Sequence, residues 1–214
     1  MLEPVTLANE ACAMAGANPV QNLDAETSTA ASVKLAYDRT QGFMLGVHPF
    51  TWAKSTRQLS RRAGAQPFTG FLYVFDLPAD RIGPPIRVTD DASDPLRSFT
   101  SYLLETDTVH ASAEPLYAQI LYLPPPRLWS APFRQCFVTA LAASLALSLK
   151  RNRTLAQDLT IQAFGTPQER NRGGQMAVAI AADSYATPAL DNPAVTHDPL
   201  TSAWRGGETW RGQR

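Results

Sequence analysis

The longest apolar stretch of the sequence, residues 128–149, most constrains how this chain can fold. Its large apolar side chains recur every four residues, which is the spacing of one face of an α-helix. They are Phe133, Phe137, Leu141, Leu145 and Leu149. Small residues, among them Ala143 and Ala146, form a flank beside this stripe, and small side chains let other helices approach closely. The stretch therefore predicts a helix with neighbours on more than one side.

The sequence also indicates where this helix begins and what surrounds it. Ser130 can cap its amino terminus, and Pro132 fits the first turn, where no backbone N–H is needed. A membrane span needs about 20 apolar residues, whereas Arg134 interrupts the run early and Lys150 follows it. We expect a helix buried in a protein core.

Two helical segments precede this stretch. Residues 5–16 form a short helix that Gly16 ends, because glycine tolerates the left-handed conformation found after helices. Residues 24–47 form a longer helix, for which Asp24 is the expected cap. The longer helix carries one main apolar stripe, made of Val33, Tyr37, Thr40, Met44 and Val47.

Two large apolar residues of the longer helix, Leu35 and Phe43, lie off that stripe. A helix that is apolar on a second face has a second surface to bury. We therefore expect this helix to contact more than one neighbour. His48, which precedes Pro49, is expected to end the helix as a hydrogen-bonded residue, since the position before proline avoids helical geometry.

Two more helical segments follow the stretch. Thr154 opens a capping-box pattern, which predicts a helix to about Phe164. Gly165, Thr166 and Pro167 interrupt the helical pattern. Residues 168–185 are then helical in alternate stretches, which Gly173 and Gly174 weaken.

The middle of the chain, residues 67–123, loses helical periodicity. Its aromatic and β-branched runs predict four short strands, at residues 68–77, 86–88, 99–105 and 116–123. Both alternating faces of the last strand are mostly apolar, so we expect it to be central. The basic residues Arg57, Arg61 and Arg62, ahead of this region, are expected to form an exposed segment.

The resulting fold class is α+β, mainly α: a helical bundle with a small antiparallel β insert and an extended C-terminal arm. We assign residues 1–187 to the helical domain, with the β insert at about residues 67–123, and residues 188–214 to the C-terminal arm. The arm has no periodicity and is rich in proline and glycine. It nevertheless carries Trp204, Arg205, Trp210 and Arg211, and Trp and Arg dominate binding hot spots. We expect these residues to bind a partner; folding back on the domain and a plain linker are the alternatives.

Composition gives few clues to the activity. The formal net charge is zero, so the chain as a whole has no electrostatic attraction for nucleic acid or anionic membrane. The two cysteines, Cys12 and Cys136, are expected to be buried and unpaired. The amino terminus lacks the basic and apolar pattern of a signal peptide, which predicts synthesis in the cytoplasm without secretion.

The candidate chemical groups do not form a site in the sequence. The histidines, His48, His110 and His197, lie far apart, and no metal-ligand spacing is present. The densest acidic group, at residues 90–94, is expected to be a solvated loop. We therefore predict no catalytic residues, no cofactor and no metal site.

Four blocks of the sequence, in this order, carry a resemblance to a known family. They are LANEACAMAGANPV at residues 7–20, YDRTQGFMLGVHPFTWA at 37–53, FLYVFDLPAD with the later IRV at 71–88, and LWSAPFRQCFVTALAASLA at 128–146. Their order and spacing resemble the head–tail connector, or adaptor, proteins of tailed phages and gene transfer agents. The likeness is to the tail tubular protein A type of short-tailed phages, and it covers most of residues 5–185.

The resemblance implies a structural protein of a virion or phage-like particle, made in the host cytoplasm. Such proteins form a ring, usually of about twelve copies, and a closed ring needs two different faces that fit each other. The implied partners are other copies of the chain, the portal protein and a tail tube, nozzle or tail-completion protein. DNA would pass through the ring and touch it only non-specifically.

Two other functions are compatible with the residues alone. A small hydrolase could use carboxylates of the β insert, namely Asp90, Asp91 or Glu105, and would need a cleft in which one carboxyl has a raised pKa. A dimerising helical regulator could be built on the two long helices. The three hypotheses therefore predict different surfaces: two contact faces for a ring, a cleft with a carboxyl of raised pKa for a hydrolase, and a dimer built on the long helices for a regulator.

Overall fold

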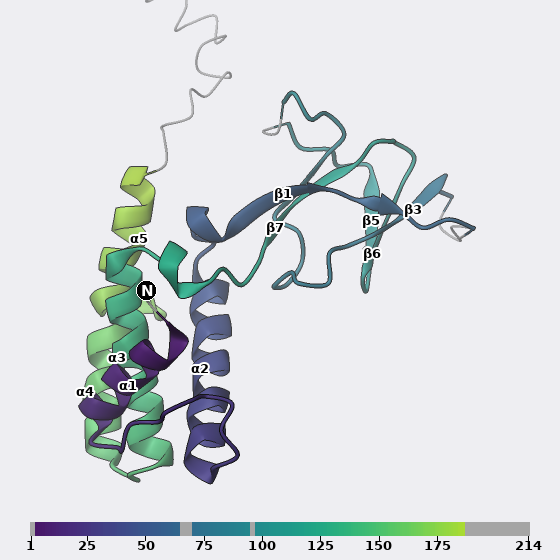
Figure 1. Ribbon diagram of the computed structural model, residues 1–214. Helices are drawn as coiled ribbons and strands as arrows, with labels where there is room; N and C mark the ends of the chain where they lie inside the picture. Colours follow the sequence, from purple (N-terminus) through teal and green to yellow (C-terminus); the bar gives the residue numbers. More distant parts are fainter. Residues whose placement is uncertain (1–2, 65–69, 95–96, 187–214) are drawn as a thin grey trace, which may run out of the picture. The chain divides into compact units, whose positions relative to one another are not determined.

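The computed structural model describes residues 3–64, 70–94 and 97–186 (Figure 1). The described structure is 47% helical and 16% strand, which confirms the predicted fold class, α+β and mainly α. The helices are α1 (Pro4–Ala15), α2 (Ser28–Val47), α3 (Ala131–Ser148), α4 (Arg153–Phe164) and α5 (Gly174–Ala186), with short 3₁₀ turns at Thr51–Ala53, Pro126–Leu128 and Pro167–Glu169. The C-terminal arm lies outside the described residues.

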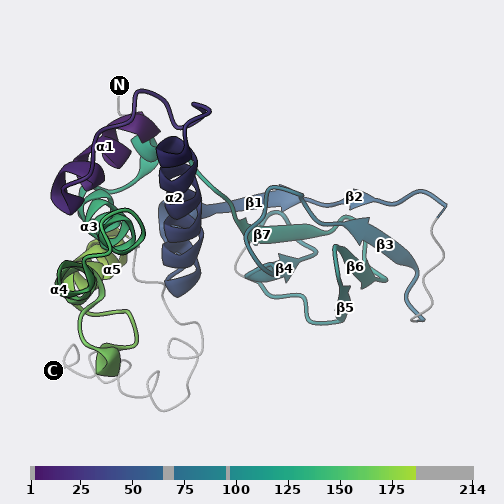
Figure 2. The same cartoon turned by 90° about the horizontal axis from the view of Figure 1, so that it is seen from below.

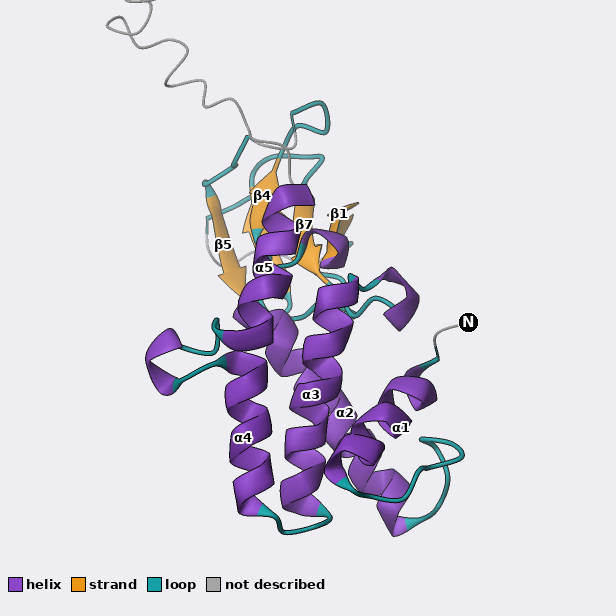
Figure 3. Ribbon diagram, turned by 90° about the vertical axis from the view of Figure 1, so that its left-hand side faces the viewer, coloured by secondary structure: helices purple, strands orange, loops and turns teal. Residues whose placement is uncertain are grey.

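Helix α3 is the centre of the helical domain, as its sequence predicts. The Ser130 hydroxyl accepts a hydrogen bond from the Phe133 N–H at 3.4 Å, and Pro132 occupies the first turn. α3 contacts α1, α2 and α4, which lie on different sides of it (Figures 2 and 3). Four of the five stripe residues are fully buried: Phe133, Phe137, Leu141 and Leu145. The prediction of neighbours on several sides is confirmed.

Two predicted helix caps are wrong. α2 begins four residues after Asp24, because the Thr27 hydroxyl accepts from the Ala30 N–H at 3.2 Å and so takes the capping position. Asp24 instead pairs with Lys34. α4 is capped by Asn152, whose side chain accepts from the Leu155 N–H at 3.1 Å, and not by Thr154. In both cases a nearby polar side chain, that of Thr27 or Asn152, accepts from the backbone N–H three residues later and so caps the helix.

The β insert begins earlier than predicted, at Lys54. Its strands are β1 (Lys54–Gln58), β2 (Ser60–Arg61), β3 (Tyr73–Asp76), β4 (Arg87–Thr89), β5 (Tyr102–Glu105), β6 (Thr108–Ala111) and β7 (Tyr117–Leu121). They form two antiparallel sheets, ordered β1-β7-β4 and β2-β3-β6-β5. The predicted central strand is β7. The basic segment around Arg57 and Arg61, for which no strand was predicted, forms β1 and β2. These strands pair with β7 and β3.

The helical domain and the β insert each have their own cluster of buried apolar side chains. The helical cluster contains an aromatic group in which Trp129 lies 5.1 Å from Phe133 and 4.9 Å from Phe137, measured between ring centroids. Tyr37 packs edge-on against Phe137 at 4.8 Å, which joins α2 to α3. The β insert has its own smaller cluster, with Val109 and Ile120 fully buried.

Candidate interaction surfaces

A groove of about 620 Å³ runs between α2, α3 and the end of α4; we call it the α2–α3 groove. It is lined by Ser32, Leu35, Ala36, Arg39, Thr40, Phe43, Ala140, Ser144, Leu147, Ser148 and Phe164. The α2 members repeat at three- and four-residue steps, so they form a single stripe along that helix. This stripe is the second apolar face that the sequence indicates for α2.

The large apolar side chains of the α2–α3 groove are left open to solvent. Leu35 is 60% exposed, Phe43 is 47% exposed, and Leu147, across the groove on α3, is 55% exposed. Phe43 has one aromatic neighbour, Phe164 of α4, in an edge-on contact at 5.5 Å between centroids. Within the described residues, α4 thus contacts the second apolar face of α2 but covers only part of it.

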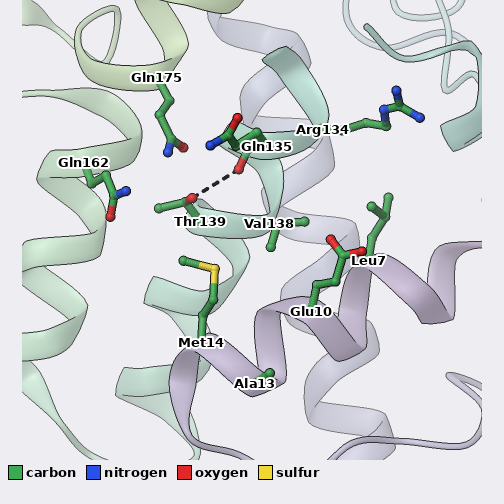
Figure 4. A pocket seen from close by; sticks show the side chains of 10 residues that line it. All are labelled: Leu7, Glu10, Ala13, Met14, Arg134, Gln135, Val138, Thr139, Gln162 and Gln175. Carbon is green, nitrogen blue, oxygen red and sulfur yellow. Dashed lines mark hydrogen bonds between the residues drawn. The ribbon is translucent and has the colours of Figure 1, made fainter. Parts of the chain in front are cut away.

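A second hollow, of about 560 Å³, lies on α3 between α1 and the α4–α5 region; we call it the α1–α3 hollow (Figure 4). It is lined by Leu7, Glu10, Ala13, Met14, Arg134, Gln135, Val138, Thr139, Gln162 and Gln175. Three of these side chains are glutamine amides, and the Oε1 atom of Gln175 is buried with no hydrogen-bond partner among the described residues. Most buried polar atoms in folded proteins have such a partner, so this amide oxygen is an uncommon feature of the hollow.

The two surfaces lie on opposite sides of α3. Thr139 lines the α1–α3 hollow and Ser148 lines the α2–α3 groove. An α-helix has about 3.6 residues per turn, so these two residues are about two and a half turns apart. The remaining half turn places their side chains on opposite sides of the helix. One helix therefore presents two partly apolar recesses that face in opposite directions.

A buried carboxylate ties the end of α5 to the segment that follows α2. Asp183 is 6% exposed and accepts hydrogen bonds from the Thr51 hydroxyl at 2.6 Å and the Thr51 N–H at 3.0 Å. Its other oxygen lies 3.2 Å from His48 Nε2. This confirms that His48 is a hydrogen-bonded residue at the end of a helix; its partner, Asp183, has no signal in the sequence because it is 135 positions away.

The carboxylates proposed for a hydrolase, Asp90, Asp91 and Glu105, line neither the α2–α3 groove nor the α1–α3 hollow. The Ser93 hydroxyl and N–H donate to Asp91 at 2.6 and 2.8 Å and lower the pKa of this carboxyl, whereas a general acid needs a raised one. Glu105 lies 3.6 Å from His110 Nε2. A recess of about 340 Å³ in the described part of the β insert is lined by other residues: Gln58, Leu59, Ser60, Arg61, Phe75, Glu114 and Pro115.

The two cysteines are buried and unpaired, as predicted. Burial raises the pKa of the Cys136 thiol to about 12, and its Sγ–H donates to the Ala163 carbonyl at 3.5 Å. Burial also raises the pKa of Cys12. Both thiols are therefore protonated at neutral pH and poorly nucleophilic. Among the described residues, no group of three or more His, Cys, Asp or Glu side chains is placed to hold a metal ion.

The arginines of β1 and its neighbours are engaged with acidic side chains. Arg57 binds Asp80 through two hydrogen bonds of 2.8 and 2.9 Å. Arg61 contacts Glu114 at 3.1 Å and lies over the Tyr73 ring. The basic side chains at the α3–α4 turn, Lys150, Arg151 and Arg153, are exposed.

The sequence-predicted contact flank lies inside the helical domain. Ala143 is 6% exposed and Ala146 is fully buried, on a helix that contacts three others of the same chain. Their contact with a second copy stays a prediction. Trp204, Arg205, Trp210 and Arg211 lie outside the described residues. Leu147 was not singled out in the sequence, although it is a large apolar residue off the main stripe of α3 and so carried the same signal as Leu35.

No protein-family model matches the chain, and no curated protein sequence matches it. None of the helices in the described part of the chain is both long and apolar enough to span a membrane.

Proposed function

We propose that this chain is a structural adaptor of a tailed phage or phage-like particle, which assembles into a ring between the portal and the tail. The observation that carries the proposal is the pair of recesses on opposite sides of α3. A ring is built from heterologous contacts, in which one face of each copy meets a different face of the next. A protomer therefore needs two distinct contact faces, and the α2–α3 groove and the α1–α3 hollow provide candidates for both.

The exposed apolar side chains of the groove support an interface in preference to a catalytic pocket. Leu35, Phe43 and Leu147 present carbon surface to water, which favours association when a partner covers it. Interfaces are depleted in charge at their centre and enriched in aromatic and large apolar side chains. The single charged side chain that lines this groove is Arg39, a residue type that interfaces favour.

The sequence resemblance to head–tail connectors supplies the identity of the partners in this proposal. They are other copies of the chain, usually about twelve in a closed ring, together with the portal and a tail tube, nozzle or tail-completion protein. DNA would pass through the ring. The zero net charge and the ion-paired arginines of β1 and β2 suit a channel that lets DNA slide.

Native mass spectrometry and negative-stain imaging of the purified full-length chain test the proposal directly. We expect a closed ring, or an oligomer that grows with concentration, and co-sedimentation with a portal ring. A monodisperse monomer at high concentration that does not bind the portal would overturn it. Substituting Phe43 with Ser should weaken oligomerisation, whereas Ile161→Ser, at an α4 position that is 51% exposed and lies outside both recesses, should not.

A further inference from the structure

We infer that the α2–α3 groove is the docking site for the C-terminal arm of an adjacent copy, with Trp204 and Trp210 as the anchors. This inference rests on the proposed ring. It adds which surface receives the arm and which side chains fill it. Three observations support it: the open apolar stripe of the groove, the spacing of the two tryptophans, and the position at which the described chain ends.

The groove has the chemistry that an indole ring needs. Its apolar side chains, Leu35 and Phe43 on one wall and Leu147 on the other, are about half exposed or more. The hydroxyls of Ser32 and Ser144 lie among them, and a tryptophan N–H usually finds such an acceptor when it is buried. An apolar wall with a few polar atoms suits tryptophan better than an aliphatic side chain.

The spacing of the tryptophans matches the length of the groove. Trp204 and Trp210 are six positions apart in the sequence. In an extended chain or a polyproline II helix, side chains at that spacing share one side and are about 19 Å apart. The groove side of α2 runs from Ser32 to Phe43, about 16 Å along the helix. Gly206 and Gly207, between the anchors, allow close approach of the backbone.

The arm is long enough to reach another copy. α5 ends at Ala186, and Asp183 fixes its last turn beside His48 and Thr51, at the carboxyl end of α2. From Ala186 to Trp204 the chain spans at most about 60 Å, which is twice the roughly 30 Å length of α2. Docking on the next copy makes a head-to-tail contact, which is the kind that closes into a ring.

Cross-linking of full-length chains tests this inference. One chain carries Ser144→Cys in the groove, a second chain of different mass carries Glu208→Cys between the two tryptophans, and a short bis-maleimide joins thiols that lie close together. The native Cys12 and Cys136 are fully buried, so they give little background. We expect a cross-linked heterodimer. Adding Trp210→Ala to the second chain should reduce its yield at least about tenfold, because truncating a buried aromatic anchor weakens binding by that much or more.

Thr160→Cys provides the matched control. Thr160 is exposed on α4, outside the groove, and like Ser144 it donates its hydroxyl to the carbonyl four residues earlier. Equal heterodimer yields from Thr160→Cys and Ser144→Cys would overturn the inference. So would cross-linking only within a chain that carries both Ser144→Cys and Glu208→Cys, unchanged on dilution, since that places the arm on its own copy. A ring without the heterodimer overturns the docking site alone, whereas a heterodimer without any ring overturns the proposed function.

Discussion

The helical domain and the β insert are held together in different ways. Among the described residues, the helical cluster contains 30 buried apolar residues drawn from all five helices, whereas the cluster of the insert contains nine. The helical cluster is also rich in aromatic rings around Trp129 and Phe133. The helical domain therefore gains its stability from burial, and the insert has much less apolar surface to remove from water.

The segments of the insert are also joined by strand pairing and by surface ion pairs. Its arginines pair across neighbouring segments: Arg57 with Asp80, Arg61 with Glu114, Arg62 with Asp76 and Arg81 with Asp107. Exposed pairs of this kind contribute little each and are weakened by salt. The recesses on α3 therefore lie on the part of the molecule with the larger core, and we expect the stability of the insert to depend more strongly on salt and pH.

A matched pair of core substitutions tests this contrast with the largest expected effect. Leu141 in α3 and Leu116 before β7 are both fully buried. Leu→Ala costs about 2–5 kcal/mol of unfolding free energy, and the cost rises with the size of the cavity that remains. We expect Leu141→Ala near the top of that range and Leu116→Ala near the bottom, because the smaller core can collapse onto the gap.

Denaturant unfolding followed by tryptophan fluorescence measures both costs, and hydrogen exchange shows where each variant opens. Leu116→Ala should raise exchange in the strands and leave α3 protected. Equal costs, together with exchange that rises in both regions, would show that the two cores unfold as one and would remove the contrast.

Overpacking at Ala146 separates contacts inside the chain from contacts between copies. Ala146→Leu should cost about 1–3 kcal/mol of unfolding free energy, because a fully buried site next to other helices has no room for three added carbons. Ala31→Leu, at an exposed position of α2, is the control. The cost should be the same at protein concentrations far below and far above assembly. A cost that appears only in the assembled state would place the Ala146 flank at an interface between copies.

The Asp183 contact sharpens the comparison where the helices meet the segment leading to the insert. Asp183→Ala should cost about 1–3 kcal/mol, because it leaves the half-buried Thr51 N–H and hydroxyl without their acceptor. Thr51→Val removes only the hydroxyl donor and should cost less. Thermal unfolding of both variants gives the order, and a larger loss for Thr51→Val would mean that the carboxylate is not the centre of this contact.

The helices were more predictable than the strands for a physical reason. The apolar residues of a buried helix recur every three to four positions, so the α3 stripe and the second apolar face of α2 could be found in the sequence. The Ser130 cap could be found because capping uses a few short polar residue types next to the helix. β1 has the pattern Lys-Ser-Thr-Arg-Gln, whose strand state depends on pairing with the distant β7. β6 was missed because its hairpin with β5 turns at Thr106, which has φ of 49° without the usual glycine or asparagine.

The same reasoning explains what could be predicted about the recesses. Leu35 and Phe43 indicated a second apolar face because they lie off the main stripe of their own helix, but not that this face would stay partly open. The buried Asp183 gave no such signal, since a hydrogen bond between distant segments leaves no periodicity. Sequence patterns thus reveal surfaces that repeat along one element, and miss sites that several elements assemble.

The smallest expected effect concerns the ion pair between Arg57 and Asp80 on the surface of the insert. The Arg57 guanidinium lowers the pKa of Asp80, so the carboxylate stabilises the folded state above its unfolded pKa of about 3.9. That contribution is lost as the pH falls through the lower folded pKa. Asp80→Asn should therefore lower the melting temperature slightly at neutral pH, and the difference from the unmodified chain should vanish in strong acid and shrink in roughly 1 M salt. Asp158→Asn, which removes an exposed carboxylate of α4, is the control for the lost charge. If Asp80→Asn behaves like Asp158→Asn, surface charge does not hold the insert together, and its stability must come from strand pairing and the nine-residue core.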